Sequence, residues 1–438
     1  MKTHQRKIPK QPASCLGALI VVLVMLLAGC ERSPQPQFRL NNVELIKQER
    51  LNLDDGEHFP EHYPTELSNI LTALFGTPNE PRFPFLLGED DDAHKILSLE
   101  NLELAAGPVS SGRKGEPSGL YREHCVQCHG ITGDGAGPTA AFLTPYPRDF
   151  RMGKFKFKST PLGKPPTDED LSRIIRHGIP GTAMPSFQTL SPTEVAALID
   201  YVKYLSIRGQ YERRLMSELA SMDGDPLLDL SLIEKEDDSE AEENHEIFEE
   251  QLYTVVGEYC SEEIVARWID PDSKITEVPA APQSYSIESA DHKKLIETGQ
   301  ALFRGKANCV QCHGDTGLGD GATDNHDAWT KDWLNTTGVD VNLPESYQHF
   351  IDAGAMRPKK IRPRNLRMPV FRGGNRPEDT YRRIINGIEG TPMPSSPTLT
   401  PEEIWALVAY VRAMPYELSD EGIGQNESHA PVNEQAIR

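Results

Sequence analysis

One hexapeptide occurs twice in this chain of 438 residues, and no other feature of the sequence constrains the fold as strongly. The sequence Cys-Val-Gln-Cys-His-Gly runs from Cys125 to Gly130 and again from Cys309 to Gly314. Two thiols three positions apart at the start of a helix, followed at once by an imidazole, form the attachment pattern for c-type haem. The thiols reach the two vinyl groups of one porphyrin, and the imidazole lies under the iron. Two identical copies are a much stronger signal than one.

We therefore predict two covalently attached haem c groups as the cofactors. A zinc ribbon is a weak alternative because the two cysteine pairs are 184 residues apart (309 − 125). A thioredoxin-like redox pair is also a weak alternative, since it requires a βαβ context. The predicted attachment and axial residues are Cys125, Cys128 and His129 in the first copy and Cys309, Cys312 and His313 in the second.

The N-terminus is typical of an export signal. Basic residues precede an apolar run from Leu16 to Ala28 that is too short to span a bilayer comfortably. The run ends in Leu27-Ala28-Gly29-Cys30, which resembles the lipobox of bacterial lipoproteins, whose chains are cut before the cysteine and acylated on it. We predict lipidation of Cys30 and a lipid-anchored protein on the periplasmic side of a bacterial membrane. The alternatives are an ordinary secretory signal and an uncleaved anchor, and both also export the chain.

The charge balance narrows the possible partners. Forty-five Lys and Arg residues oppose 66 Asp and Glu residues, which leaves a net charge of −21. A surface this acidic repels phosphate backbones, so we exclude nucleic acid as a partner. Only the N-terminal run is apolar enough to consider for a bilayer, so a polytopic membrane protein is also excluded. The length favours two or three domains.

The two halves also repeat each other downstream of the haem motifs. Many residues of segment 169–194 recur in segment 378–403 at a constant offset of 209. The offset at the haem motifs is only 184, so the second copy carries 25 additional residues (209 − 184), mostly between Ala322 and Arg362. This pattern indicates a duplicated domain with an insertion in its second copy.

The repeated segments carry helix signals. Thr167-Asp168-Glu169-Asp170 opens a short helix that Gly178 ends. Ser191-Pro192-Thr193-Glu194 and Thr400-Pro401-Glu402-Glu403 are capping boxes with proline at the first helical position, and each precedes an apolar stripe at helical spacing. We also expect a helix over about 290–303, before the second haem motif, and a counterpart in the first copy that Pro117 shortens.

Both regions resemble class I c-type cytochromes, over residues 112–208 and 288–416, about half of the chain. The family pattern includes a glycine-rich loop after the haem motif, present here at 133–138 and 317–321. Glycines there let the backbone approach the porphyrin edge. The resemblance implies an all-α fold with two tandem cytochrome c domains, in which the final helix packs across the helix before the haem motif.

The resemblance also implies the second axial ligands. Met184 and Met393 lie where the family places a thioether ligand, which favours ferrous iron and raises the reduction potential relative to two histidines. The alternative is that both methionines fill gaps in a core. His177 is a rival ligand for the first haem, but its counterpart is Asn386, so we interpret it as structural or as a surface residue.

A further repeated pair is Pro147-Arg148 and Pro363-Arg364. The resemblance implies that a proline carbonyl here accepts a hydrogen bond from Nδ1 of the axial histidine, and that the arginine pairs with a haem propionate. Either contact tunes the iron through its ligands. The alternative is a loop proline followed by a solvated arginine.

The domain organisation that follows has six parts. In order, they are a lipoprotein signal peptide (1–29), a tether and loop-rich N-terminal extension (30–111), the first cytochrome c domain (112–208), an acidic linker with an amphipathic helix (209–287), the second cytochrome c domain (288–416) and a C-terminal tail (417–438). Within the extension, Thr65-Glu66-Leu67 opens a helix. This segment either covers the first haem domain or docks a partner.

The linker contains an acidic run over 234–250, followed by apolar residues at helical spacing that include Ile247, Leu252 and Val255. Such a run is usually a solvated face, and the alternative is a docking site for a basic partner. Cys260 belongs to neither haem motif, and we predict that it is a buried apolar residue and not a reactive thiol.

Together these features predict a membrane-tethered dihaem c-type cytochrome that transfers electrons between redox protein partners outside the cytoplasmic membrane, and not an enzyme. One alternative is a haem subunit of a larger respiratory oxidoreductase complex. Another is a dihaem peroxidase, which needs an iron with an open position, whereas this sequence offers a methionine to both irons.

Overall fold

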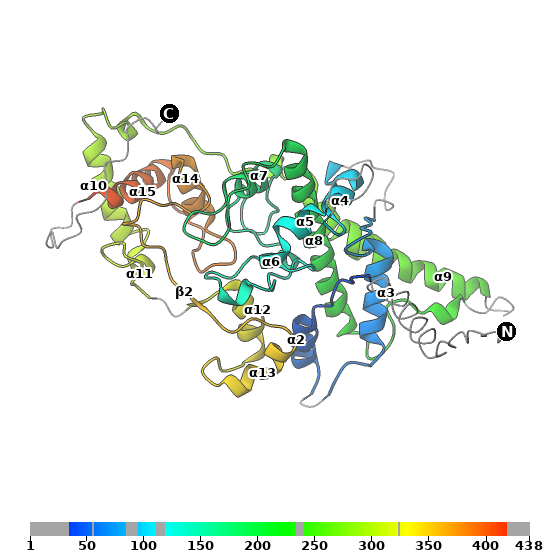
Figure 1. The fold of residues 1–438 in the computed structure, drawn as a ribbon. Coiled ribbons are helices and arrows are strands. Elements are labelled where there is room, and N and C mark those ends of the chain that lie inside the picture. Colours follow the sequence, from blue (N-terminus) through cyan, green and yellow to red (C-terminus); the bar gives the residue numbers. More distant parts are fainter. Residues whose placement is uncertain are drawn as a thin grey trace, which may run out of the picture. The chain divides into compact units, whose positions relative to one another are not determined.

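The computed structural model describes residues 35–54, 57–84, 95–109, 119–233, 241–322 and 325–417 (Figure 1). Signal peptide, Cys30, Pro117 and most of the C-terminal tail lie outside these residues. The predicted all-α class is confirmed, because the described strands are only β1 (Asn325–His326) and β2 (Lys360–Ile361), which pair antiparallel. None of the described helices has the length and apolar character needed to cross a membrane.

The described part of the N-terminal extension contains three α-helices, α2 (Asn42–Asn52), α3 (Tyr63–Phe75) and α4 (Leu99–Ala105). The helix that we predicted to open at 65–67 is α3, which begins two residues earlier at Tyr63. Its inward side chains, among them Leu67, Leu71 and Phe75, are fully buried. The extension therefore contributes to the core of the first haem domain instead of serving only as a tether.

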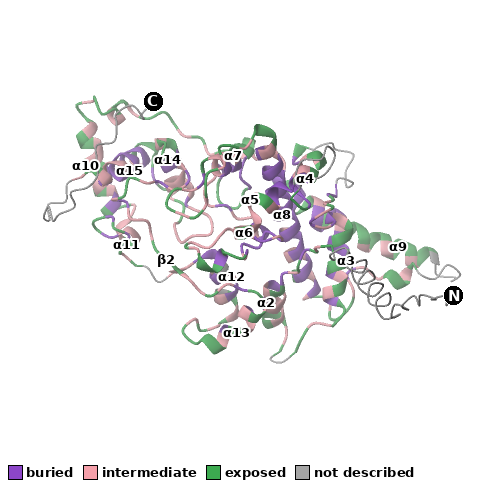
Figure 2. Cartoon of the chain, in the orientation of Figure 1, coloured by how far each residue is buried: buried purple, intermediate pink, exposed green. Residues whose placement is uncertain are grey.

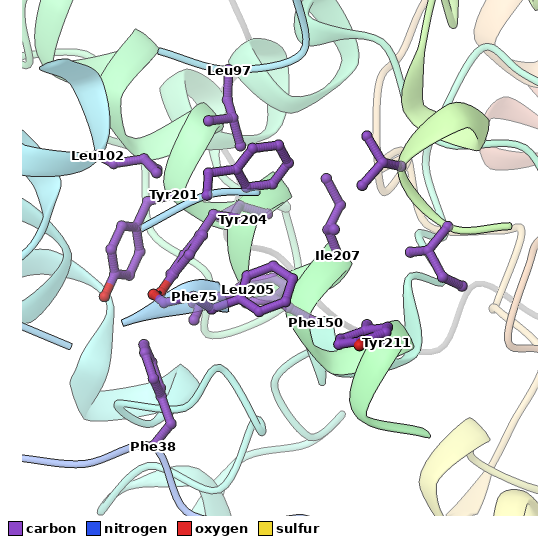
Figure 3. Packing of buried hydrophobic residues seen from close by; sticks show 14 of the residues in the cluster. Phe38, Phe75, Leu97, Leu102, Phe150, Tyr201, Tyr204, Leu205, Ile207 and Tyr211 are labelled. Carbon is purple, nitrogen blue, oxygen red and sulfur yellow. The ribbon is translucent and has the colours of Figure 1, made fainter. Parts of the chain in front are cut away.

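The first haem domain contains α5 (Leu120–His124), α6 (Val126–His129), α7 (Asp168–His177) and α8 (Pro192–Leu219). Both predicted capping boxes are present, at Thr167 with Asp170 and at Ser191 with Glu194. In the resulting core, Phe75 of the extension lies near Tyr204 and Tyr211 of α8 (Figure 3). Figure 2 shows that buried residues follow α8 along its length.

Helix α8 does not end near our predicted domain boundary at 208. It continues to Leu219, and Tyr211, Leu215 and Met216 in this continuation are fully buried in the first core. The physical reason is that apolar residues keep recurring at helical spacing, so each added turn buries more surface against the extension.

The predicted linker also belongs in part to the first domain. It contains α9 (Ala241–Leu252) and a π-helix, η5 (Tyr253–Glu262). Ile247 and Leu252 on α9 are each 41% exposed, whereas Val255 and Cys260 on η5 are buried in the first core. Cys260 is fully buried, which confirms that part of the prediction, and burial raises the pKa of its thiol to about 12. The amphipathic face therefore begins later than we predicted, after the acidic run.

The second haem domain contains α10 (His292–Arg304), α11 (Val310–His313), α14 (Pro377–Asn386) and α15 (Pro401–Ala413). Helix α15 crosses α10 as the resemblance implies, so closely that a side chain at Gly299 would overlap the carbonyl of Ala406. Phe303 and Tyr410 meet at this crossing, with ring centroids 5.5 Å apart. In the first domain the corresponding contact joins Tyr121 of α5 to Tyr201 of α8.

The insertion of the second domain forms α12 (Ala328–Thr337), α13 (Pro344–Asp352) and the two short strands. Trp333, Tyr347 and Phe350 form a small apolar cluster that packs against Val43 and Ile46 of α2. At the same contact, Asp332 lies 3.0 Å from Arg213 of α8 and 3.3 Å from Lys47 of α2. The insertion thus joins the second domain to the extension of the first.

Candidate functional site

The first haem motif places its histidine on α6, in a half-buried position. The Nδ1 atom of His129 lies 3.0 Å from the backbone carbonyl oxygen of Arg148. A carbonyl only accepts, so Nδ1 carries the proton, and Nε2 keeps a free lone pair for a metal. Burial lowers the pKa of His129 to about 4, so the imidazole is neutral at physiological pH. The ring stacks on Phe150, with centroids 4.5 Å apart.

The second motif repeats this geometry on α11. The Nδ1 atom of His313 lies 3.2 Å from the carbonyl oxygen of Arg364, and burial lowers its pKa as well. No ring stacks on His313 as Phe150 does on His129 among the described residues; Phe303 is tilted against it at 6.3 Å. Each domain thus presents one neutral imidazole with its tautomer set by a backbone carbonyl.

The accepting carbonyl corrects one of our predictions. We expected Pro147 and Pro363 to accept from the histidines, but the carbonyls of Arg148 and Arg364 do so. The reason is that the segment is tied to the glycine-rich loop two residues further on: the amide of Phe150 donates to the carbonyl of Gly133 at 2.8 Å, and the intervening Asp149 has an extended backbone. The second domain has the matching bond, from the Leu366 amide to the carbonyl of Gly317 at 2.7 Å.

The glycine-rich loops have the same shape in both domains. Gly133 and Gly317 adopt positive φ angles of 73° and 77°. A Cβ atom at either position would come within 2.9 Å of a core side chain, Leu205 or Met414 respectively. Only glycine combines this backbone conformation with so close an approach. The loops therefore hold the segments that carry the accepting carbonyls against the haem motifs.

The loops around Met184 and Met393 are also equivalent. The Met184 amide donates to Thr182 Oγ1 and the Met393 amide donates to Thr391 Oγ1, each at 3.2 Å. The carbonyl of each methionine accepts a hydrogen bond of 3.2 Å from the backbone amide of the isoleucine five residues earlier. Both methionines are half-buried. The repeat in sequence is therefore a repeat in local backbone structure, which a gap-filling methionine does not require.

The motif cysteines are free thiols. Cys125, Cys128, Cys309 and Cys312 are all half-buried, and none of these four forms a disulfide. Burial raises the pKa of Cys125 to about 12 and that of Cys309 to about 11. His177, the rival ligand, is exposed and lies 3.2 Å from Gln188 Nε2, in agreement with our interpretation of it as a surface residue.

Comparison with known families identifies the two regions. The family model described as cytochrome c oxidase, cbb3-type, subunit III matches residues 113–202, and the one described as cytochrome c matches residues 296–415. The protein is a c-type cytochrome with two tandem domains. Among solved structures, a chain of the reducing HAO-like protein complex of Kuenenia stuttgartiensis is 23% identical, covers 68% of this chain and 94% of its own, and has a TM-score of 0.43. No curated protein matches the cytochrome.

Cytochrome c domains bind haem c covalently, and the residues of this cytochrome fit that group. Each motif offers two reduced thiols and one imidazole whose Nε2 is available. In the second domain, Arg364 also has a buried Nε with no hydrogen-bond partner, although its Nη2 donates to the carbonyl of Met368 at 2.8 Å. A buried, unpaired guanidinium donor is costly, and a carboxylate such as a haem propionate would satisfy it.

The arginine of the first domain has a different setting. The Arg148 guanidinium lies beside Gly390 of the second domain, with Nη1 3.1 Å from the position that a Cβ atom would take there. Sequence reasoning missed this contact and also missed Arg372, which reaches the first domain. Both contacts join segments more than 190 residues apart (372 − 181 and 390 − 148), and no motif in the sequence marks them.

Proposed function

We propose that this cytochrome carries two haem c groups, one in each domain, and transfers electrons between redox protein partners outside the cytoplasmic membrane. The observation that carries the proposal is the equivalence of the two sites: in each, a backbone carbonyl holds a neutral histidine, and a methionine follows in a loop with the same hydrogen bonds. A protein that bound only one haem would not need a second histidine and a second methionine loop with the same hydrogen bonds.

The side chains of each domain have distinct roles in this proposal. The cysteine pair, Cys125 with Cys128 or Cys309 with Cys312, forms the thioethers that attach the porphyrin. The Nε2 atoms of His129 and His313 and the thioether sulfurs of Met184 and Met393 would hold the iron. When bound, the iron would supply a reversible one-electron couple, and a protein in which two side chains hold each iron would offer no free position to a substrate. This favours electron transfer over peroxidase chemistry.

Surface charge suggests the chemistry of the partners. The net charge of −21 favours partners with basic docking surfaces, because complementary charge speeds diffusional encounter. Such partners include both soluble electron carriers and membrane oxidoreductases. The cytochrome meets them, in this proposal, while it is held at the periplasmic face of a bacterial membrane by lipid on Cys30.

The haem count tests the first part of the proposal. We expect the mass of the intact mature protein to exceed that of its polypeptide by two haems and the lipid on Cys30. Replacement of Cys309 and Cys312 together by serine should remove one haem and leave the other, since the two motifs lie in different domains. Cys260→Ala is the matched control, because this cysteine is outside both motifs, and it should retain both haems. A wild-type protein with one haem would contradict the proposal.

The anchor is tested separately. Changing Cys30 to serine should block both acylation and processing at this site, because the thiol that receives the lipid is lost. Cys15→Ser, inside the signal, should leave processing unchanged. Mass spectrometry of the mature N-terminus and membrane fractionation provide the measurement. An unmodified wild-type N-terminus at a different residue would exclude the lipoprotein assignment and leave the haem proposal intact.

A further inference from the structure

The methionine loop of the first domain is contacted by an arginine of the second. Arg372 Nη2 donates to the carbonyl of Gly181 at 3.1 Å. Gly181 lies three residues before Met184, in the loop that presents the sulfur. The side chain of Val370 lies against the same glycine, 3.7 Å from the position of a Cβ atom. A group outside the first domain therefore helps to set the position of that domain's methionine loop.

The methionine loop of the second domain also lies against an arginine of the other domain, without a hydrogen bond like that of Arg372 among the described residues. Arg148 of the first domain places its guanidinium against Gly390, which lies three residues before Met393. The adjacent Glu389 forms an ion pair with Lys158 of the first domain and accepts from the amide of Gly163 at 3.3 Å. The first domain thus holds the second methionine loop through the ion pair of Lys158 with Glu389 and through the hydrogen bond from the Gly163 amide to the Glu389 carboxylate.

The surrounding contacts place both loops at one interface. Arg173 of α7 lies 2.9 Å from Asp379 of α14, and Asn386 Nδ2 donates to the carbonyl of Thr160 at 3.4 Å. Helices α7 and α14 are the repeat equivalents that immediately precede the two methionine loops. The contacting residues, however, are not repeat equivalents, because the repeat equivalent of Arg148 is Arg364 and not Arg372.

We propose that Arg372 and Arg148 are positioning residues that act across the domain interface, each holding the methionine loop of the other domain, so that the two haem sites form one coupled pair within a single chain. The proposal rests on the function proposed above. One electron leaves one site, which is oxidised, and enters the other, which is reduced, with no bond broken and no proton required. A rigid interface keeps the two sites at a constant separation for this transfer.

Loss of one arginine should therefore affect the haem of the opposite domain. In Arg372→Ala, we expect the sulfur-to-iron charge-transfer band to lose the contribution of one haem, or that haem's reduction potential to shift, with the other haem unchanged. Arg148→Ala should affect the second haem in the same way. Arg372→Lys should keep most of the wild-type band and potential, because lysine is also a cationic hydrogen-bond donor. Redox titration followed by visible absorption measures both quantities.

Arg173→Ala provides the matched control. It removes an ion pair at the same interface, to Asp379, but touches neither methionine loop, so both haems should keep their bands and potentials. Arg372 is only half-buried, so its replacement should not prevent folding. Haem content of each variant verifies this.

The kinetics of electron equilibration provide a second measurement. After rapid partial reduction, the wild type should show a phase of haem-to-haem equilibration whose rate is independent of protein concentration. The double variant Arg148→Ala/Arg372→Ala should lose or slow this phase. If the wild type shows two methionine-ligated haems but neither arginine variant alters a band, a potential or this phase, the coupling is wrong and the proposed function stands. If the wild type lacks methionine-ligated haems, the proposed function itself fails.

Discussion

Replacing Met184 or Met393 with alanine is expected to lower the reduction potential of one haem by on the order of 0.1 V, a fraction of the ~0.8 V over which axial ligands set haem potentials. The thioether is a neutral, soft ligand that favours ferrous iron, and its loss removes that preference. In each variant, the iron of one haem should change from low-spin to high-spin, or a weaker ligand should take the place of the methionine. Attachment through the cysteine pair should survive, because the methionine loop lies far from it in sequence.

Met368→Ala is the matched control for both variants. This methionine is 55% exposed and lies outside both methionine loops, so its replacement should leave both potentials unchanged. Potentiometric titration and the sulfur-to-iron charge-transfer band provide the readouts. Two wild-type haems without that band, or peroxide turnover at the rate of a true peroxidase, would overturn the assignment of an electron carrier.

Replacing Glu212 with alanine is expected to destabilise the first domain by about 3–5 kcal/mol, the usual cost of removing one partner of a buried ion pair. Glu212 and Arg208 on α8 lie 3.2 Å apart, and their side chains are 0% and 4% exposed. Glu212 also accepts from the amide of Asn41 at 2.8 Å, which ties the extension to α8. Without the carboxylate, the Arg208 cation stays buried beside Phe38 with no other ion-pair partner among the described residues.

The same helix offers a matched control. Arg214 and Glu218 have the same spacing and lie 2.7 Å apart, but their side chains are 26% and 27% exposed. Glu218→Ala should cost only about 0.2–1 kcal/mol, as exposed pairs do. Arg214 also keeps Glu263 as a partner. Urea unfolding of the holoprotein, read as a change in midpoint at constant slope, compares the two variants. If Glu212→Ala and Glu218→Ala lower the free energy of unfolding equally, the buried pair of Arg208 and Glu212 makes no special contribution to stability.

The local features of both sites could be predicted from the sequence. The haem motif, the glycine-rich loop and the capping boxes at Ser191 and Thr400 each depend on residues within a few positions of one another. Duplication strengthened these predictions, because a pattern that occurs twice in equivalent places is not coincidental. The all-α class was implied by the resemblance to class I c-type cytochromes, and the structure confirms it.

The prediction that the carbonyls of Pro147 and Pro363 accept from the histidines was wrong, because local sequence patterns do not determine which carbonyl faces the histidine. A carbonyl's direction depends on the backbone dihedral angles of an extended loop, and side-chain identity determines these only weakly. The bond from the Phe150 amide to Gly133 brings the loop and the haem motif together, and it selects the carbonyl of Arg148. No sequence pattern near Pro147 predicts the hydrogen bond from the Phe150 amide to Gly133.

The sequence by itself determined the chemistry of this protein: the cysteine pairs, the histidines, the repeated methionines and the helices beside them. Only the tertiary structure decided which distant segments share a core. It placed Phe75 and Val255 in one cluster with α8, set Asp332 between Arg213 and Lys47, and brought Arg372 to Gly181. The physical reason is that haem attachment needs residues at a short, defined spacing. Long-range packing depends instead on the shape and charge of complementary surfaces, which many different sequences can provide.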